Sequence, residues 1–492
     1  MKRPLIGGLV TAFALLLAAC GSSSSNNNED TGGTPPTPPA PPDAQVQVVH
    51  ASADAPAVDV LVNGVVPDGL AGVPFAIASP YLELAPGTTD VAVNALLPDG
   101  TGVRAISADG LELASDVAYT AIAAGSTAGL LAGAEAGNEL QLFLLTRPVL
   151  AAIDGVRIQV LHGSPSAPEV DVYVTAPDAE LAGIEPATFA FGEVLDLDTV
   201  PAAEYRIRVT PAGDATVVFD SGAVALPNGA DLSIIAVDNT GPGAAPIALL
   251  AVFADGTVVE LRDGGAAAPA GLTAVHNSAD APTVCVVADD ATTDDVERIE
   301  LFAGVPFRAF GYLGEIPPGS YFVGLEVFDG ETGCAGATAI TFDDAVELAP
   351  GAEATGIVAG GLGDGSLELL ALADDLRPIA TEARVRIVHG SALTPAVDIY
   401  VVAAGTDITG PDVAPAFSNV EFRGSTGFVP LLPGEYDVFV TLAGDTTPAI
   451  TVAGLALDGG EVISAIASDP VGEEVAPGLV VIDHVALKSP NP

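Results

Sequence analysis

Residues 45–62 read QVQVVHASADAPAVDVLV, and the same pattern returns three times along the chain. The later copies are VRIQVLHGSPSAPEVDVYV at 156–174, LTAVHNSADAPTVCVV at 272–287 and VRIVHGSALTPAVDIYV at 385–401. Their shared histidines are 112, 114 and 113 residues apart, at His50, His162, His276 and His389. So regular a period, longer than the 20–50 residues of solenoid repeats, indicates four tandem domains that each fold around their own core.

Each copy has the pattern of short β-strands joined by turns. In the first copy Val46, Val48 and His50 alternate with residues of the opposite face, and a proline turn leads into a second alternating strand, Val58–Val62. Later in the repeats a Pro-Gly turn precedes another strand, as in Leu432-Pro433-Gly434-Glu435-Tyr436. No segment has a convincing helical period. We therefore predict an all-β chain of four sandwiches, each with about seven strands.

The repeats and the segments between them define the expected domains. We place the four sandwiches at 44–150, 155–262, 272–378 and 383–487. The joints at Arg147–Leu150 and Arg377–Ile379 are apolar enough to dock neighbouring domains, whereas Arg262–Gly271 is rich in Gly and Ala and resembles a linker. This predicts two semi-rigid pairs of domains with a hinge between the pairs.

The amino terminus has the features of an exported lipoprotein. Residues 1–19 contain Lys2 and Arg3 followed by an apolar run too short to span a membrane, which indicates a signal peptide. The run ends in Leu17-Ala18-Ala19-Cys20-Gly21, a lipobox pattern that predicts lipid attachment to Cys20. Residues 20–43 are rich in Ser, Asn and Pro, which predicts a disordered tether. Gly21 favours sorting to an outer membrane, so a membrane is the expected partner of the lipid anchor.

The charge of the chain limits the partners of the folded part. There are 64 acidic residues against 15 Lys and Arg, for a formal net charge of −49. Nucleic acid is excluded as an expected partner, because neutralising phosphates requires clustered basic side chains. The surplus of carboxylates is compatible with loose binding of divalent cations. The chain has no Trp, which weakens a carbohydrate-binding interpretation without removing it.

The histidines and the serines two positions after them are the candidate chemical groups. They are His50 and Ser52, His162 and Ser164, His276 and Ser278, and His389 and Ser391. A catalytic pair would need an orienting acid and an oxyanion hole, and one such His per copy cannot supply three or four metal ligands. The other interpretation is that each His and Ser end a buried strand and hold the adjacent turn by hydrogen bonds. We favour this structural role, in which the imidazoles are buried and lie away from any large cleft, and expect no catalytic residue, metal site or cofactor.

Two further sets of residues have alternative interpretations. Asp59, Asp171 and Asp398 stand nine positions after a histidine and are either calcium ligands, catalytic acids or turn-bonding groups, of which we favour the last. Cys285 takes this position in the third copy. Because Cys20 is expected to carry lipid, Cys285 and Cys334 remain as an even pair, and an oxidising compartment predicts a disulfide between them. The acidic stretches Asp289–Glu297 and Asp343–Asp344 lack the ligand spacing of a calcium loop.

The opening V-x-V-x-H-x-S-x-x-x-P-x-V-D-V-Y-V and the later L-P-G-x-Y strand resemble the bacterial domain of unknown function 4397. The resemblance extends over nearly all of 44–487 as four copies, and the third copy departs most, at Cys285. It implies immunoglobulin-like sandwiches in an exported protein. It carries no known activity, so no catalytic residue is transferred from it.

The sequence therefore favours a non-enzymatic, lipid-anchored protein of the cell envelope that is structural, adhesive or ligand-presenting. A module that binds polysaccharide or divalent cations is the alternative, and an exported hydrolase comes third. The expected partners besides the membrane are an envelope protein or a polysaccharide. The sequence leaves open the oligomeric state and whether the domains face the periplasm or the cell surface.

Overall fold

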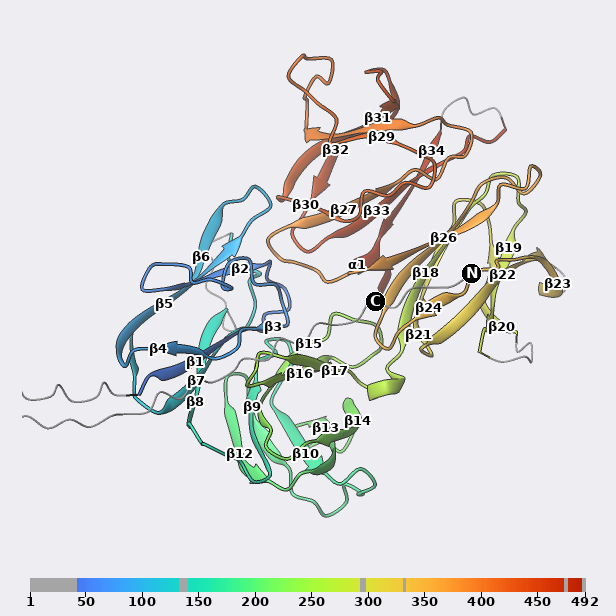
Figure 1. Ribbon diagram of the computed structural model, residues 1–492. Helices are drawn as coiled ribbons and strands as arrows, with labels where there is room; N and C mark the ends of the chain where they lie inside the picture. Colours follow the sequence, from blue (N-terminus) through green and yellow to red (C-terminus); the bar gives the residue numbers. More distant parts are fainter. Residues whose placement is uncertain (1–41, 132–139, 293–297, 331–332, 473–476, 489–492) are drawn as a thin grey trace, which may run out of the picture. The chain divides into compact units, whose positions relative to one another are not determined.

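The computed structural model describes residues 42–131, 140–292, 298–330, 333–472 and 477–488 (Figure 1). In this part the chain is almost entirely β-strand and forms four repeats, each built from two sheets. The expected signal peptide, Cys20 and most of the tether lie outside the described residues. In the described part of the chain, no helix has the length and apolar character needed to span a bilayer.

The first two repeats run from β1 to β17. Repeat 1 contains β1 (Ala44–His50), β2 (Val58–Val62), β3 (Ile77–Ala78), β4 (Leu82–Leu84), β5 (Gly87–Leu96), β6 (Gly102–Leu113), β7 (Val117–Ala124) and β8 (Gln141–Pro148). Repeat 2 contains β9 (Val156–His162), β10 (Val170–Thr175), β11 (Ala187–Phe189), β12 (Val194–Val200), β13 (Ala203–Pro211), β14 (Phe219–Leu226), β15 (Asp231–Asp238), β16 (Ile247–Phe253) and β17 (Val258–Leu261).

The last two repeats follow a short 3-10 helix, η1 (Gly265–Ala267). Repeat 3 contains β18 (Ala270–Asn277), β19 (Val284–Asp290), β20 (Ile299–Val305), β21 (Phe310–Ile316), β22 (Gly319–Asp329), β23 (Gly333–Thr341), β24 (Val346–Leu348), β25 (Glu353–Ala359) and β26 (Glu368–Asp374). Repeat 4 contains β27 (Ala383–Val388), β28 (Val397–Ala403), β29 (Phe417–Val420), β30 (Val429–Leu431), β31 (Gly434–Leu442), β32 (Pro448–Leu457), β33 (Val462–Ser468), β34 (Gly478–Asp483) and a final helix α1 (His484–Lys488).

One sheet of each repeat holds the strand that ends at or next to the motif histidine, and we call it the motif sheet. The four motif sheets have the strand orders β3-β1-β7-β8 with β4 also on β1, β12-β9-β15-β16-β17, β21-β18-β25-β26 and β30-β27-β33-β34. The first strand always pairs in parallel with a late strand, β7, β15, β25 or β33, and the other pairings are antiparallel. A parallel partner requires a long crossover, and the second sheet of the repeat provides it.

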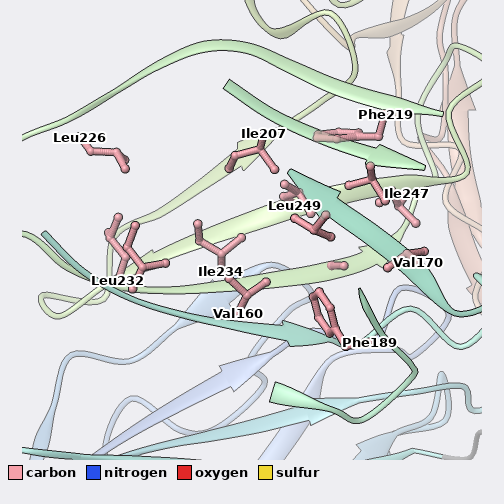
Figure 2. Close-up of a cluster of buried hydrophobic side chains, with 14 of the residues drawn as sticks. Val160, Val170, Phe189, Ile207, Phe219, Leu226, Leu232, Ile234, Ile247 and Leu249 are labelled. Atoms are coloured by element: carbon pink, nitrogen blue, oxygen red, sulfur yellow. The ribbon is translucent and has the colours of Figure 1, made fainter. Parts of the chain in front are cut away.

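The second sheets complete the sandwiches. Their orders are β2-β5-β6, β11-β10-β13-β14, β20-β19-β22-β23 with β24 on β22, and β29-β28-β31-β32. The two sheets of repeat 2 enclose a continuous apolar core that includes Val160, Phe189, Ile207, Phe219 and Leu232 (Figure 2). The all-β sandwich prediction is confirmed. The described strands of each repeat number eight or nine rather than about seven, because short edge strands such as β3 and β11 are added.

The turn before the tyrosine strand is held by the tyrosine itself. The Tyr205, Tyr321 and Tyr436 hydroxyls donate to the carbonyl oxygens four residues upstream, at 2.8, 2.7 and 2.9 Å. This is the arrangement known as a tyrosine corner in immunoglobulin-like sandwiches. Repeat 1 has a buried Thr89 at the equivalent position and makes its turn without this bond.

The first strand of each repeat is buried on both faces, which the simple alternating pattern does not predict. The face with the histidine points into the repeat's own core, and the opposite face packs on another repeat. Val49 and Ile122 of repeat 1 share one apolar cluster with Leu161 and Ile235 of repeat 2. The residues at the same positions in repeats 3 and 4 form a second cluster with the same organisation, containing Val275, Ile357, Val388 and Ile466. The motif sheets therefore pair repeat 1 with repeat 2 and repeat 3 with repeat 4.

A polar residue three positions before the histidine crosses these paired faces. Gln47 donates to the Phe253 carbonyl of repeat 2 at 2.8 Å, and Gln159 donates to the Thr146 carbonyl of repeat 1 at 3.2 Å. In repeat 4 the position is occupied by Arg386, which is almost fully buried and forms an ion pair with the buried Asp374 of repeat 3. Buried polar groups cost stability unless they are paired, so these bonds also fix the register of the two repeats.

The stretch at the central joint differs from the linker expected from its sequence. Ala268 and Ala270 are buried, and Gly264 donates to the Asp220 carbonyl of repeat 2 at 2.9 Å. Small residues favour this close packing as much as they favour flexibility. In the described residues no apolar cluster joins repeats 2 and 3, in contrast to the outer joints. Hinge motion at this joint stays a prediction.

The segment between repeats 3 and 4 makes a contact that the sequence did not reveal. Arg377 donates to the Ala53 and Ala55 carbonyls of repeat 1, at 2.9 and 2.7 Å, and its guanidinium lies 5.1 Å from the centre of the Phe75 ring. The Ala380 amide donates to the Asp54 carbonyl at 2.8 Å. The segment thus ties the second pair of repeats to the motif turn of the first repeat.

We expect the paired faces to contribute strongly to stability, and two adjacent residues of β34 test this. Ile482 is fully buried in the cluster between repeats 3 and 4, whereas Val481 on the other face is 49% exposed. Ile482→Ala should cost about 2–5 kcal/mol, and Val481→Ala should cost about 0.5 kcal/mol or less. Calorimetry measures the loss. Hydrogen exchange should report weaker protection in β25 of repeat 3 for the first variant alone, and equal effects of both would contradict the pairing.

Candidate functional site

All four motif histidines are buried and make the same hydrogen bond. Their Nε2 atoms lie 2.9–3.0 Å from the carbonyl oxygens of Pro56, Pro168, Pro282 and Pro395, each six residues further along the chain. The imidazoles of His50, His162, His276 and His389 are at most 2% exposed. Because a carbonyl can only accept, Nε2 carries the proton and Nδ1 is the acceptor in the neutral ring. Each histidine therefore fixes the turn between the first two strands of its repeat.

An aromatic ring completes the surroundings of each histidine. Phe75, Phe189, Phe307 and Phe422 meet the imidazole edges at ring-centre distances of 6.0–6.4 Å. In repeats 3 and 4 the arginine that follows, Arg308 or Arg423, stacks on the phenylalanine at 4.9 or 5.2 Å. Such packing orients the ring and keeps water from the turn.

The motif serines bond to oxygen acceptors and not to the imidazoles. The Ser52 hydroxyl donates to the Gly125 carbonyl at 2.8 Å, and the Ser391 hydroxyl donates to Asp469 at 2.6 Å. It is the backbone amide of Ser52 that points at Nδ1 of His50, at 3.4 Å. Nucleophilic catalysis requires the hydroxyl to donate to the histidine, so this arrangement does not activate the serine.

The carboxylates beside the serines were missed in the sequence, and they come from two different places. In repeats 1 and 3 the acceptor is two residues after the serine, at Asp54 or Asp280. In repeats 2 and 4 it is Asp238 or Asp469, at or just after the end of the parallel partner strand. The S-x-D spacing in 52–54 and 278–280 was a readable signal for the first pair. The second pair depends on which strands are neighbours.

Three of the histidines also contribute to the lining of internal cavities, and the cavity at His389 measures only about 20 Å³. His276 borders a cavity of about 470 Å³ inside repeat 3, and His162 borders one of about 160 Å³ inside repeat 2. We expected the imidazoles to lie away from any large cleft, so this expectation is wrong for repeat 3. The reason is that the histidine face of the first strand is the core face, and the cavity lies in the core.

The aspartates nine positions after the histidines hold neighbouring loops. Asp171 accepts from the Gly213 amide at 2.9 Å, and Asp398 accepts from the Asn419 and Gly444 amides at 2.7 and 2.8 Å. Asp59 of repeat 1 accepts from the Gly72 amide at 2.8 Å. These bonds fit the turn-bonding role that we favoured over calcium or catalysis.

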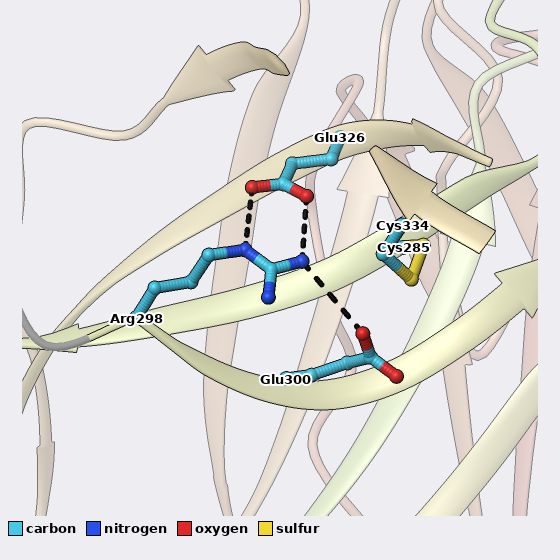
Figure 3. Close-up of a disulfide and its surroundings, with 5 residues drawn as sticks. All are labelled: Cys285, Arg298, Glu300, Glu326 and Cys334. Carbon is cyan, nitrogen blue, oxygen red and sulfur yellow. Dashed lines mark hydrogen bonds and ion pairs between the residues drawn. A yellow bond between two sulfur atoms is a disulfide. The ribbon is translucent and has the colours of Figure 1, made fainter. Parts of the chain in front are cut away.

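In repeat 3 a disulfide takes the place of this aspartate. Cys285 of β19 is joined to Cys334 of β23, with a Cα–Cα distance of 5.8 Å (Figure 3). Cys334 lies in the hairpin equivalent to those that hold Gly213 and Gly444. The covalent bond therefore ties the same two segments that the aspartate ties by hydrogen bonds in repeats 2 and 4.

An ion pair lies beside the disulfide. Arg298 binds the almost fully buried Glu326 through two bonds, of 2.7 and 2.6 Å, and approaches Glu300 at 3.7 Å (Figure 3). Bidentate contacts of this kind are among the strongest between side chains. They attach the start of β20 to β22.

The described residues contain no group of three or more His, Cys, Asp or Glu side chains arranged to hold a metal ion. Of the acidic stretches noted in the sequence, Asp290 accepts bonds from Thr292, and 293–297 lie outside the described residues. His484, the one histidine outside the motifs, is buried against Ser464 at 2.8 Å.

Comparisons with known proteins identify the repeats. The model of a domain of unknown function, DUF4397, matches residues 44–173, 156–262 and 270–400. The comparison with curated proteins gives no match. Among solved structures, the TIE protein of Bacillus anthracis is similar at 11% identity over 89% of this chain and 75% of its own, with a TM-score of 0.15. A Bacteroides fragilis protein provisionally described as a cell adhesion protein is 13% identical over 45% of this chain and 98% of its own, with a TM-score of 0.16. At such scores neither similarity bears on function.

Burial of the motif histidine makes repeat 1 sensitive to acid. Desolvation lowers the pKa of His50 to about 4 from the usual 6.5; the bond to Pro56 opposes this effect, and nearby Arg377 adds to it. Between these values the unfolded chain binds a proton that the folded chain excludes. Stability present above pH 6.5 should therefore fall as the pH drops towards 4, by up to about 3 kcal/mol. His50→Gln keeps a hydrogen-bond donor for the Pro56 carbonyl and cannot titrate. Melting curves of this variant should therefore show a smaller loss of stability over this pH range. An equal loss in both proteins would contradict the assignment.

Removal of the disulfide should destabilise repeat 3. The bond closes a loop across a sequence separation of 49 residues, for which chain entropy predicts about 4 kcal/mol. The Cys285→Ser/Cys334→Ser protein should show a lower melting transition for this repeat in calorimetry. Reductant should shift the wild-type transition to the same temperature and leave the variant unchanged. If reductant also lowered the melting temperature of the variant, the effect of reductant would not come from this disulfide.

Proposed function

The chain belongs to the DUF4397 family, and from that premise we propose that it is a lipid-anchored, non-enzymatic protein of the cell envelope whose repeats act as a structural or ligand-presenting array. The observation that carries the proposal is that the side chains of the motif histidines and serines are engaged in hydrogen bonds within the fold. In every repeat the histidine and serine are bonded to turn or strand atoms of the same repeat. Groups already engaged in this way hold the fold and are not poised for chemistry.

The pairing of the repeats supports a structural role. Two copies of the same apolar interface, one in each pair, build the array from units larger than a single sandwich. A strand buried on both faces resists local opening more than one exposed to water on one side. Such blocks suit a protein that positions a surface or a ligand at a distance from a membrane.

The amino-terminal sequence supports the anchor and the location. The lipobox around Cys20 supplies the lipid acceptor, and the Ser-, Asn- and Pro-rich stretch that follows supplies reach. The surplus of acidic residues keeps the repeats soluble and away from anionic headgroups. We propose an outer-membrane location on these grounds. No observation on the described residues favours the polysaccharide or divalent-cation alternative.

The anchor is tested by a substitution at the proposed lipid acceptor. Cys20→Ser should abolish incorporation of labelled palmitate and move the protein from the membrane fraction to the soluble fraction. Ser22→Ala, two residues away, is the matched control and should leave both properties unchanged. Retention of Cys20→Ser in the membrane fraction would contradict the lipid anchor.

A chemical probe for activated serines tests whether the protein is non-enzymatic. A fluorophosphonate probe, which reacts with activated serines, should not label the purified chain. Labelling that disappears in Ser52→Ala or its equivalents would establish an activated serine and overturn this part.

A further inference from the structure

The interior of repeat 3 contains a larger cavity than the interiors of repeats 2 and 4. Its cavity of about 470 Å³ lies between the two sheets, compared with about 160 Å³ in repeat 2 and about 20 Å³ in repeat 4. The apolar core of repeat 3 is divided into two clusters, as is that of repeat 1, whereas repeats 2 and 4 each have one continuous core. A volume of this size is in the range of small-molecule sites.

The cavity is encoded by small residues at four core positions. Where repeat 3 has Ala274, Ala288, Ala354 and Gly356, the other repeats carry larger side chains at most of the equivalent places. Two positions before the histidine they have Val48, Val160 and Ile387, and twelve positions after it Val62, Val174 and Val401. The other two small residues lie on the parallel partner of the first strand. In repeats 1, 2 and 4 the position of Ala354 is occupied by Tyr119, Leu232 and Ile463. The position of Gly356 is occupied by Ala121, Ile234 and Ala465. Truncation at four facing positions leaves space because a folded core relaxes only partly.

The lining offers almost no polar group to a ligand. It is formed mainly by aliphatic residues of both sheets, such as Leu272, Val286 and Leu325. Away from the mouth, the Tyr312 hydroxyl on the lining donates to Glu353 at 3.1 Å, and His276 is bonded to the Pro282 carbonyl. A ligand inside the cavity is therefore recognised by its shape and apolar surface.

The cavity reaches the surface between the edge strands β20 and β21. Ile299 and Glu300 on β20 and Glu315 on β21 belong to its lining and are exposed. The nearby Arg298 is engaged by Glu326 and Glu300. The mouth thus carries carboxylates whose charge opposes an anionic head group and favours a neutral or cationic one.

The disulfide is the second feature that distinguishes this repeat, and an ion pair lies beside it. Cys285–Cys334 joins β19 to β23, on either side of β22, and Arg298 attaches the start of β20 to β22. Both hold the second sheet together from its own strands, without contacts across the core. Cross-links within one sheet leave the space between the two sheets of the sandwich open to a ligand.

We propose that repeat 3 is a binding domain for one unbranched alkyl chain with a neutral or cationic head group, which enters between β20 and β21 and lies in the cavity between the sheets. The cavities of repeats 2 and 4 are smaller, and in this proposal the other repeats serve as its support. This site is independent of the lipid anchor at Cys20, and its failure in a test leaves the anchoring proposal unaffected.

The test uses the full chain with Cys20→Ser, so that no acyl group attached at residue 20 can compete. The probes are 1-dodecanol below its solubility limit, and dodecyltrimethylammonium and laurate below their micelle concentrations. Native mass spectrometry with calorimetry gives stoichiometry and affinity. We expect one molecule of each of the first two per chain, and roughly tenfold weaker binding of laurate because of the carboxylates at the mouth. Hydrogen exchange should slow in β20 and β21 when dodecanol is bound. Equal or tighter binding of laurate would overturn the head-group assignment.

Filling the cavity supplies the decisive variant. Ala354→Leu, which restores the residue of repeat 2, should raise the melting temperature of repeat 3 and reduce dodecanol affinity at least tenfold. Ala303→Leu places the same side chain at an exposed position of β20 and should leave binding unchanged. If no probe binds and Ala354→Leu merely stabilises, the cavity is a packing defect and the proposal is wrong. If dodecanol binds Ala354→Leu as tightly as it binds the protein with Ala354, the site lies elsewhere and the proposal is wrong. The same holds if dodecanol does not slow hydrogen exchange in β20 and β21 of the protein with Ala354.

Discussion

The burial of the first strand on both faces is the constraint on which the rest of this structure depends. One face of β1, β9, β18 and β27 packs in the core of its own sandwich, and the other packs on the paired repeat. A strand in this position must satisfy all of its polar groups within the protein, because water reaches neither face. Three features satisfy the polar groups at the end of the strand. They are the parallel partner strand, the histidine bond to the proline carbonyl and the serine bond to a carboxylate. The same constraint explains Gly390, since a Cβ there would lie 2.7 Å from the Ala467 carbonyl oxygen.

The repeats meet this constraint with different residues. Asp54 and Asp280 accept the serine bond from within the motif, whereas Asp238 and Asp469 reach it from the neighbouring strand. The alternation follows the pairing, since each pair contains one repeat of each kind. A tie between the second strand and a neighbouring hairpin is likewise made by a carboxylate in repeats 2 and 4 and by a disulfide in repeat 3. Physical roles are kept while the residues that fill them change.

Repeat 3 departs from its neighbours in several respects that fit together. Its core positions carry smaller residues, its interior is hollow, and its second sheet is reinforced by a disulfide and by an ion pair to the buried Glu326. Each change alone would be a local variation. An open core loses apolar contacts, and links within one sheet keep that sheet intact without refilling the core. This combination sets one domain of the array apart as the place where a ligand would be held.

The sequence by itself determined the repeat number, the all-β class, the first two strands of each repeat and the family, because these depend on local patterns repeated at a fixed period. His50 and its equivalents could be placed at a strand end beside a turn because both features are local. The tertiary structure alone decided what covers Val49 and Leu161, because an alternating strand reveals two apolar faces and not what packs on each. It alone decided that Arg377 reaches the motif turn of repeat 1 and that Asp469 meets Ser391, since these residues are brought together by the fold from distant parts of the chain. The cavity in repeat 3 belongs to the same class, since four small residues become one space only when two sheets face each other.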